Sequence, residues 1–151
     1  MRLSKIVKFN DIELIPREDC DYQYNYVRLA ERIASGEVDK VQALRAMCRD
    51  DYFFFAYFVL GMKNLNCPYG VETCKELNAE DANDLTPILD LWAREHLKTS
   101  LIVTTGVIKK ILKDPEKRVV IFSYSKSAAV KILRPIKLLL ETSDFLKWLF
   151  P

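Results

Sequence analysis

The chain has 151 residues, of which 50% are hydrophobic and 29% charged, with only 4 Gly and 6 Pro. This composition is typical of a globular domain with a buried core, and it excludes collagen-like, low-complexity and wholly disordered chains. The formal net charge of +2 hides an asymmetry, because residues 99–151 carry 10 Lys/Arg against 4 Asp/Glu, whereas residues 1–98 carry 13 against 17. The basic last third is compatible with a surface for phosphate groups or with ordinary solvated helix faces.

The cysteines and the single histidine do not form a metal-binding pattern. No CxxC pair is present, and His96 lies far along the chain from every cysteine, which argues against a zinc site. No signal peptide is visible, and the longest apolar run, residues 52–60, is shorter than the ~20 residues that a membrane span needs. We therefore expect a protein that acts inside a cell, without membrane contact and with four reduced thiols, Cys20, Cys48, Cys67 and Cys74.

The first half of the chain is predicted to be mainly helical. Residues 1–17 alternate weakly and suggest an extended lead-in or an edge strand. Apolar spacing and capping residues predict helices at 21–33, 38–48 and 52–60 and a short helix at 71–77, with a loop at 64–70 and a polar connection at 78–86. The consecutive aromatic residues after Asp51 would point all round their helix, which favours a buried core over a surface on which bases stack.

The pattern changes after Pro87. Residues 88–92 read as a strand, 93–97 as a polar turn, and 98–112 as a helix that ends near Asp114-Pro115. Residues 118–122, or 118–124, are apolar and β-branched and read as a second strand, followed by an amphipathic helix that Pro135 should kink. Strand, helix, strand, helix predicts an α/β protein with a parallel βαβ core and a right-handed crossover.

The turn between the first of these strands and its helix has the features of a phosphate-binding loop. The first N–H groups of a helix are unpaired and carry partial positive charge, a lysine reaches the β and γ phosphates, and a hydroxyl ligates Mg²⁺. Lys98 and Thr99 meet these requirements, whereas the usual pattern G-x-x-x-x-G-K-[ST] has glycines at the places of Trp92 and Leu97. An ordinary strand-to-helix turn with a solvated lysine is the alternative.

The run Leu-Trp-Ala-Arg-Glu-His-Leu-Lys-Thr-Ser-Leu-Ile at 91–102 resembles the deviant Walker A segment of the large terminase subunits of tailed bacteriophages. In that family the loop often begins with a small residue followed by arginine and ends in Lys-[ST]-[ST]. The similarity continues through 119–126 to 145–151 and, more loosely, includes 49–55 and 59–61. The resemblance implies a P-loop ATPase that drives viral DNA into a procapsid in the host cytoplasm.

The resemblance also implies cofactors, partners and residue roles. ATP and Mg²⁺ would be the cofactors, and double-stranded DNA, a small terminase subunit and the portal would be the partners. Lys98 would contact the β and γ phosphates, Thr99 or else Ser100 would hold Mg²⁺, and Arg94 would act catalytically by stabilising charge. A salt bridge is the alternative role for Arg94, and His96 is expected to shape the loop rather than to act as a base. The nucleotide-binding residues expected on this basis are Ala93, Arg94, Glu95, His96, Leu97, Lys98, Thr99 and Ser100.

The sequence contains no apolar strand ending in Asp-Glu, the Walker B feature that holds the metal and orients the attacking water. We therefore expect an incomplete P-loop NTPase: a mainly helical N-terminal region at 1–86, then at 87–151 the first part of an ATPase core that ends before Walker B and does not hydrolyse ATP alone. The alternatives are a non-enzymatic module whose helical residues 20–77 dock a terminase partner beside a vestigial loop, and an unrelated small α/β domain. A two-stranded sheet with open edges also predicts self-association.

Overall fold

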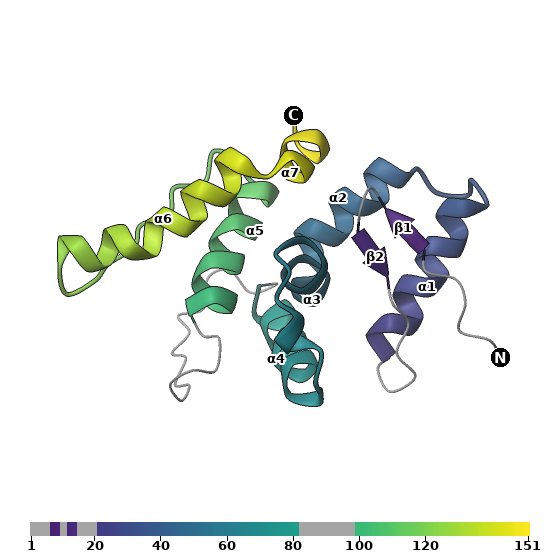
Figure 1. The fold of residues 1–151 in the computed structure, drawn as a ribbon, viewed down its shortest axis with the longest axis horizontal. Helices are drawn as coiled ribbons and strands as arrows, with labels where there is room; N and C mark the ends of the chain where they lie inside the picture. The colour runs from purple at the N-terminus through teal and green to yellow at the C-terminus, as the bar shows by residue number, and fades with distance from the viewer. Residues whose placement is uncertain (1–6, 10–11, 15–20, 82–98) are drawn as a thin grey trace.

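The computed structural model describes residues 7–9, 12–14, 21–81 and 99–151. Helices make up most of this part of the chain, and they pack around α3 at the centre, with α1 and the β1–β2 pair at one end and α6 at the other (Figure 1). The elements in chain order are β1 (Val7–Phe9), β2 (Ile12–Leu14), α1 (Asp21–Ala34), α2 (Lys40–Asp50), α3 (Tyr52–Phe54), η1 (Phe55–Val59), η2 (Lys63–Leu65), α4 (Pro68–Asp81), η3 (Thr99–Thr105), α5 (Gly106–Lys113), α6 (Lys126–Thr142) and α7 (Asp144–Leu149).

The helices expected in the first half are confirmed, with shifted ends. The helix α1 stops before Gly36, whose positive φ of 79° favours glycine, and Asp39 caps α2 by accepting a hydrogen bond from the N–H of Gln42. The helix α4 is longer than predicted because it begins at Pro68, and proline is favoured as a first helical residue, where no N–H partner is needed. The extended lead-in contains β1 and β2, which pair antiparallel.

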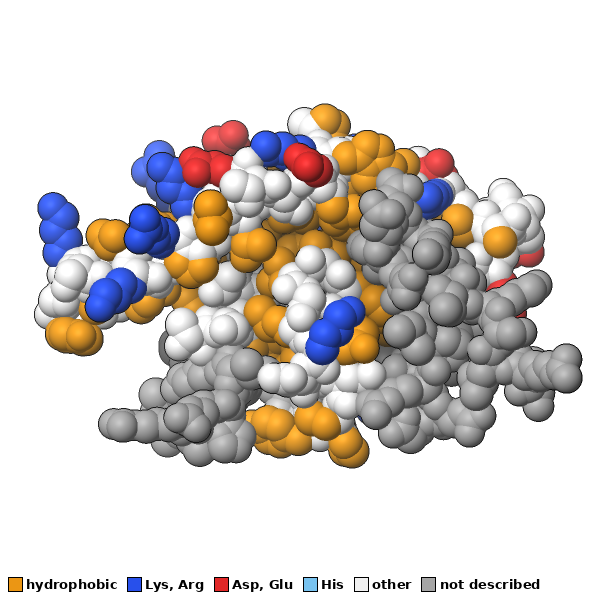
Figure 2. Space-filling model, in the orientation of Figure 1, with side chains coloured by type: hydrophobic (Ala, Val, Ile, Leu, Met, Phe, Trp, Pro, Cys, Tyr) orange, Lys and Arg blue, Asp and Glu red, His pale blue; other side chains and the backbone are white. Residues whose placement is uncertain are grey.

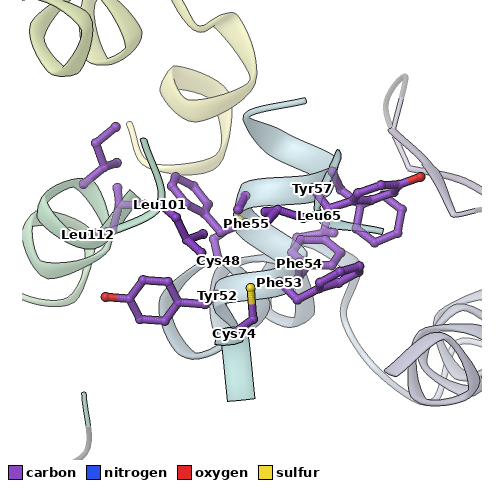
Figure 3. Close-up of a cluster of buried hydrophobic side chains, with 14 of the residues drawn as sticks. Cys48, Tyr52, Phe53, Phe54, Phe55, Tyr57, Leu65, Cys74, Leu101 and Leu112 are labelled. Atoms are coloured by element: carbon purple, nitrogen blue, oxygen red, sulfur yellow. The ribbon is translucent and has the colours of Figure 1, made fainter. Parts of the chain in front are cut away.

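The aromatic run forms the core, as predicted. The aromatic side chains of α3 and η1 are all buried, and Tyr26 of α1 contacts the rings of Phe53, Phe54 and Phe58. The ring of Tyr52 points away from those of Phe53 and Tyr57, which stack at 5.3 Å on the other side of the helix (Figure 3). A helix that is apolar on every side must be covered on every side, and neighbouring helices from both halves of the chain supply that cover.

The helix predicted at 98–112 is also present in its described part. Residues 99–105 form η3, a π-helical stretch, which continues without a break as α5 to Lys113. Ser125 caps α6, which runs through Pro135, and Ser143 caps α7. Two arginines of α2 hold this half in place, because Arg49 donates to the carbonyl of Leu112 at 2.9 Å and Arg45 to that of Leu149.

The expected α/β fold with a parallel βαβ core is wrong. Residues 118–124, predicted as its second strand, are irregular and mostly exposed, and they pair with no other segment in the described ranges. The only strand pairing in those ranges is the antiparallel β1–β2 pair, with Val7 opposite Leu14. An apolar, β-branched run becomes a strand only when a neighbouring strand accepts its backbone hydrogen bonds, so side-chain pattern alone was insufficient.

The other predicted strand, 88–92, lies outside the described residues, as does the predicted border between 86 and 87. Buried residues from both sides of that border, such as Leu44 and Ile108, belong to one hydrophobic cluster. Across the ranges that the structure describes, no helix has both the length and the apolar character needed to cross a bilayer.

Candidate functional site

The structure describes two of the eight phosphate-loop residues predicted from the sequence. Ala93, Arg94, Glu95, His96, Leu97 and Lys98, and with them the catalytic role expected for Arg94, lie outside the described residues. Thr99 and Ser100 are described and form the first turn of η3, with Thr99 exposed and Ser100 half-buried. Thr99 is the first described residue of this helix.

Threonine hydroxyls shape the first turns of this helix. Thr105 donates from its hydroxyl to the carbonyl of Ser100 at 3.0 Å, and Thr104 donates to that of Thr99 at 3.4 Å. Both bonds span five residues, which is the spacing of a π-helix. They occupy carbonyl groups of η3 and none of its N–H groups.

The hydroxyls of Thr99 and Ser100, one of which is expected to hold Mg²⁺, are both among the described groups. No cluster of three or more His, Cys, Asp or Glu side chains that could hold a metal occurs in the described ranges. A single hydroxyl fits Mg²⁺ held mainly by phosphate oxygens and water, which is how this ion binds beside nucleotides. It does not fit a metal bound by a protein cage.

A second cluster of polar groups is buried between α1, α2, α3 and α5. Its centre is Asp51, whose carboxylate accepts a 2.7 Å hydrogen bond from the hydroxyl of Tyr26 and a 3.0 Å bond from the N–H of Phe54. The backbone N–H of Asp51 donates to the carbonyl of Met47, so this one residue ends α2 and caps α3. Burial raises the pKa of the Asp51 carboxyl, and the hydrogen bonds from Tyr26 and Phe54 oppose that rise.

Lys109 of α5 supplies the positive charge of this cluster. Its side chain is 0% exposed, and the ammonium lies 3.9 Å from the centre of the Tyr52 ring, a cation–π contact. Burial raises the pKa of the Cys48 and Cys74 thiols to about 12, although the charge of Lys109 lowers both. Thiols that stay protonated are poor nucleophiles, so this cluster orders the core and is not suited to thiol chemistry.

The helix α5 approaches Tyr52 closely because residue 106 is glycine. A Cβ at Gly106 would lie 2.9 Å from the Tyr52 hydroxyl oxygen, closer than side-chain atoms tolerate. The same approach brings Lys109, one turn further along α5, over the Tyr52 ring. The buried position of Lys109 was not predicted, yet it lies four residues after Thr105 and three before Leu112, on the apolar stripe of the helix.

Comparison with known proteins gives no family to which the chain can be assigned. No protein-family model, no curated protein sequence and no solved structure matches it. The possible functions therefore follow from the residues themselves and from the resemblance of 91–102 to a Walker A segment.

Proposed function

We propose that the protein binds ATP with Mg²⁺ through residues 93–100, as a part of a DNA-packaging ATPase of the terminase large-subunit type. The observation that carries this proposal is that residues 99–113, which directly follow Lys98 of the Walker A-like run, are helical. Phosphate groups bind at the N-termini of helices because the N–H groups point toward the ligand and the helix dipole favours negative charge. The proposal uses this helix together with the residue pattern of 91–102.

Each residue has a defined role in this proposal. Lys98 contacts the β and γ phosphates, the first N–H groups of η3 donate to phosphate oxygens, and Thr99 contributes one oxygen to Mg²⁺. Arg94 spreads its donors over the phosphates. In the same proposal the chain works in the host cytoplasm on double-stranded viral DNA with a small terminase subunit and a portal, and it binds ATP without hydrolysing it alone.

Titration calorimetry with Mg²⁺–ATP tests the proposal. We expect saturable binding to the full chain. Lys98→Ala should lower the affinity about 10- to 100-fold, which corresponds to the free energy of a hydrogen bond between charged groups. Lys131→Ala, which removes an exposed lysine from α6, is the matched control and should bind ATP as the unaltered chain does. Equal affinity in all three proteins, or no binding to any, would refute the proposal.

A non-enzymatic interaction module is the second candidate function. It is favoured by the number of large apolar side chains that remain exposed on residues 118–124 and on α6. Basic side chains alternate with apolar ones along α6, which extends away from the rest of the helices (Figures 1 and 2). A chain that binds no nucleotide but associates tightly with a terminase subunit would fit this candidate and not the first.

A further inference from the structure

Three large aliphatic side chains of α6 face solvent. Val130, Leu133 and Leu138 are 52%, 50% and 56% exposed. All 17 residues of α6 are described, and Ile136 is the one among them that is buried. Apolar side chains grouped in this way on one surface helix mark a place where something else binds.

The exposed face of α6 is also strongly basic. Its four basic side chains, all exposed, are Lys126, Lys131, Arg134 and Lys137. The single acidic residue of the helix is Glu141, whose carboxylate lies 3.5 Å from the ammonium of Lys137. In the described part of the chain the other three basic side chains have no carboxylate partner. Positive charges without counter-charges favour a negatively charged partner.

The basic and apolar side chains alternate around this face. Successive residues of an α-helix are about 100° apart, since one turn holds 3.6 residues. On this wheel Val130 lies between Lys137 and Arg134. Leu138 lies between Arg134 and Lys131. The face therefore has no apolar stripe separate from its charges, and a partner must offer negative and apolar groups side by side.

We propose that this face of α6 binds the surface of a bilayer that contains anionic phospholipids. Each lipid brings a phosphate for a basic side chain and an acyl chain for the aliphatic side chain beside it, which matches the alternating pattern. Lysine and arginine stems lie along apolar surface while their charged ends reach the headgroups. A helix that lies in the interface needs no length to cross the bilayer, so the absence of a membrane-spanning run does not bear on this contact.

Two other negatively charged partners match this face less well. The backbone of a duplex nucleic acid would pair with the basic side chains, but it would cover the aliphatic ones with charged phosphates and sugars. A helix of another protein would need a continuous apolar stripe at spacings of three and four residues. Val130 and Leu133 begin such a stripe, but its next position is Lys137.

Sedimentation of the full chain with lipid vesicles tests the proposal. One set of vesicles is phosphatidylcholine alone, and the other has one third of it replaced by phosphatidylserine. A basic residue near an anionic surface contributes about fivefold in affinity, so the net charge of +3 on α6 predicts about 100-fold tighter binding to the second set. Equal binding to both sets, or binding to neither, would overturn the proposal.

Charge reversal identifies the helix that binds. Lys131→Glu/Arg134→Glu should lose the preference for phosphatidylserine. Arg28→Glu/Lys75→Glu, which makes the same change in net charge at exposed positions of α1 and α4, should keep it. None of these residues belongs to 93–100, so the result is independent of ATP binding. Loss of the preference in both variants to the same degree would show a general charge effect and refute a site on α6.

Two further measurements separate a bilayer from the other partners. Leu133→Gln/Leu138→Gln keeps the charge and the helix propensity, and it should weaken binding to the anionic vesicles about tenfold, because two apolar side chains no longer enter the lipid. No change in this variant would contradict lipid contact. A duplex oligonucleotide at the same phosphate concentration should bind more weakly than the anionic vesicles do, and tighter binding to the oligonucleotide would also overturn the proposal.

Discussion

Raising the pH from 7 to 10 should destabilise the protein through Cys48 and Cys74. Burial raises the pKa of both thiols from 9.0 to about 12, so in this range they stay protonated in the folded chain and ionise in the unfolded chain. Their contribution to stability is complete below pH 9 and is lost as the pH rises toward 12. At pH 10 each thiol favours unfolding by ~1.4 kcal/mol relative to pH 7, or ~2.8 kcal/mol for the pair.

Urea denaturation of the reduced protein at pH 7 and at pH 10 measures this loss. The double variant Cys48→Ala/Cys74→Ala should be less stable at pH 7, because it removes buried atoms, but its stability should fall by ~2.8 kcal/mol less between the two pH values. Cys67→Ala is the matched control, because that cysteine is exposed. If the double variant keeps the full pH dependence, the thiols do not titrate as their burial implies and the reasoning is refuted.

Three substitutions test the packing around the central helix, each by the change in free energy of unfolding in dilute protein. Tyr26→Phe should cost ~1–3 kcal/mol, because it removes a 2.7 Å hydrogen bond to a half-buried carboxylate; no change would show that this bond is not formed. Phe55→Ala should cost ~3–5 kcal/mol and Phe122→Ala less than about 0.5, since the first side chain is fully buried and the second 90% exposed; equal costs would contradict this core. Gly106→Ala should destabilise by ~1–3 kcal/mol despite its better helix propensity, and less in a Tyr52→Phe background, where the hydroxyl that its Cβ would meet is gone; the same cost in both backgrounds would exclude that clash.

The helices were predictable because their signals are local. Asp39 and Ser125 cap helices through their own side chains, Gly36 ends one through its positive φ, and the apolar spacing of 21–33 requires no knowledge of the partner. The predicted core role of the aromatic run followed from the same reasoning, because a helix that is apolar all round has to be buried.

That residues 118–124 form no strand was not predictable from such signals, because a strand depends on a partner that lies elsewhere in the chain or in another chain. The buried Lys109 was missed for a related reason. Lysine is rarely fully buried, so its position on an apolar stripe did not by itself indicate burial, whereas the nearby Tyr52 ring compensates its charge. In the proposed nucleotide site, Thr99 and Ser100 are helical, in agreement with the helix predicted at 98–112.

The most direct test of nucleotide binding is the response of backbone amide signals to Mg²⁺–ATP in a nuclear magnetic resonance titration. Binding of phosphate at the start of η3 predicts that the largest shifts among residues 99–151 fall on Thr99 and Ser100, that amide exchange slows there, and that both effects vanish in Lys98→Ala. Shifts confined to the basic side of α6 would contradict a phosphate site at this helix. So would a shift of the Thr99 amide signal in Lys98→Ala as large as in the unaltered chain.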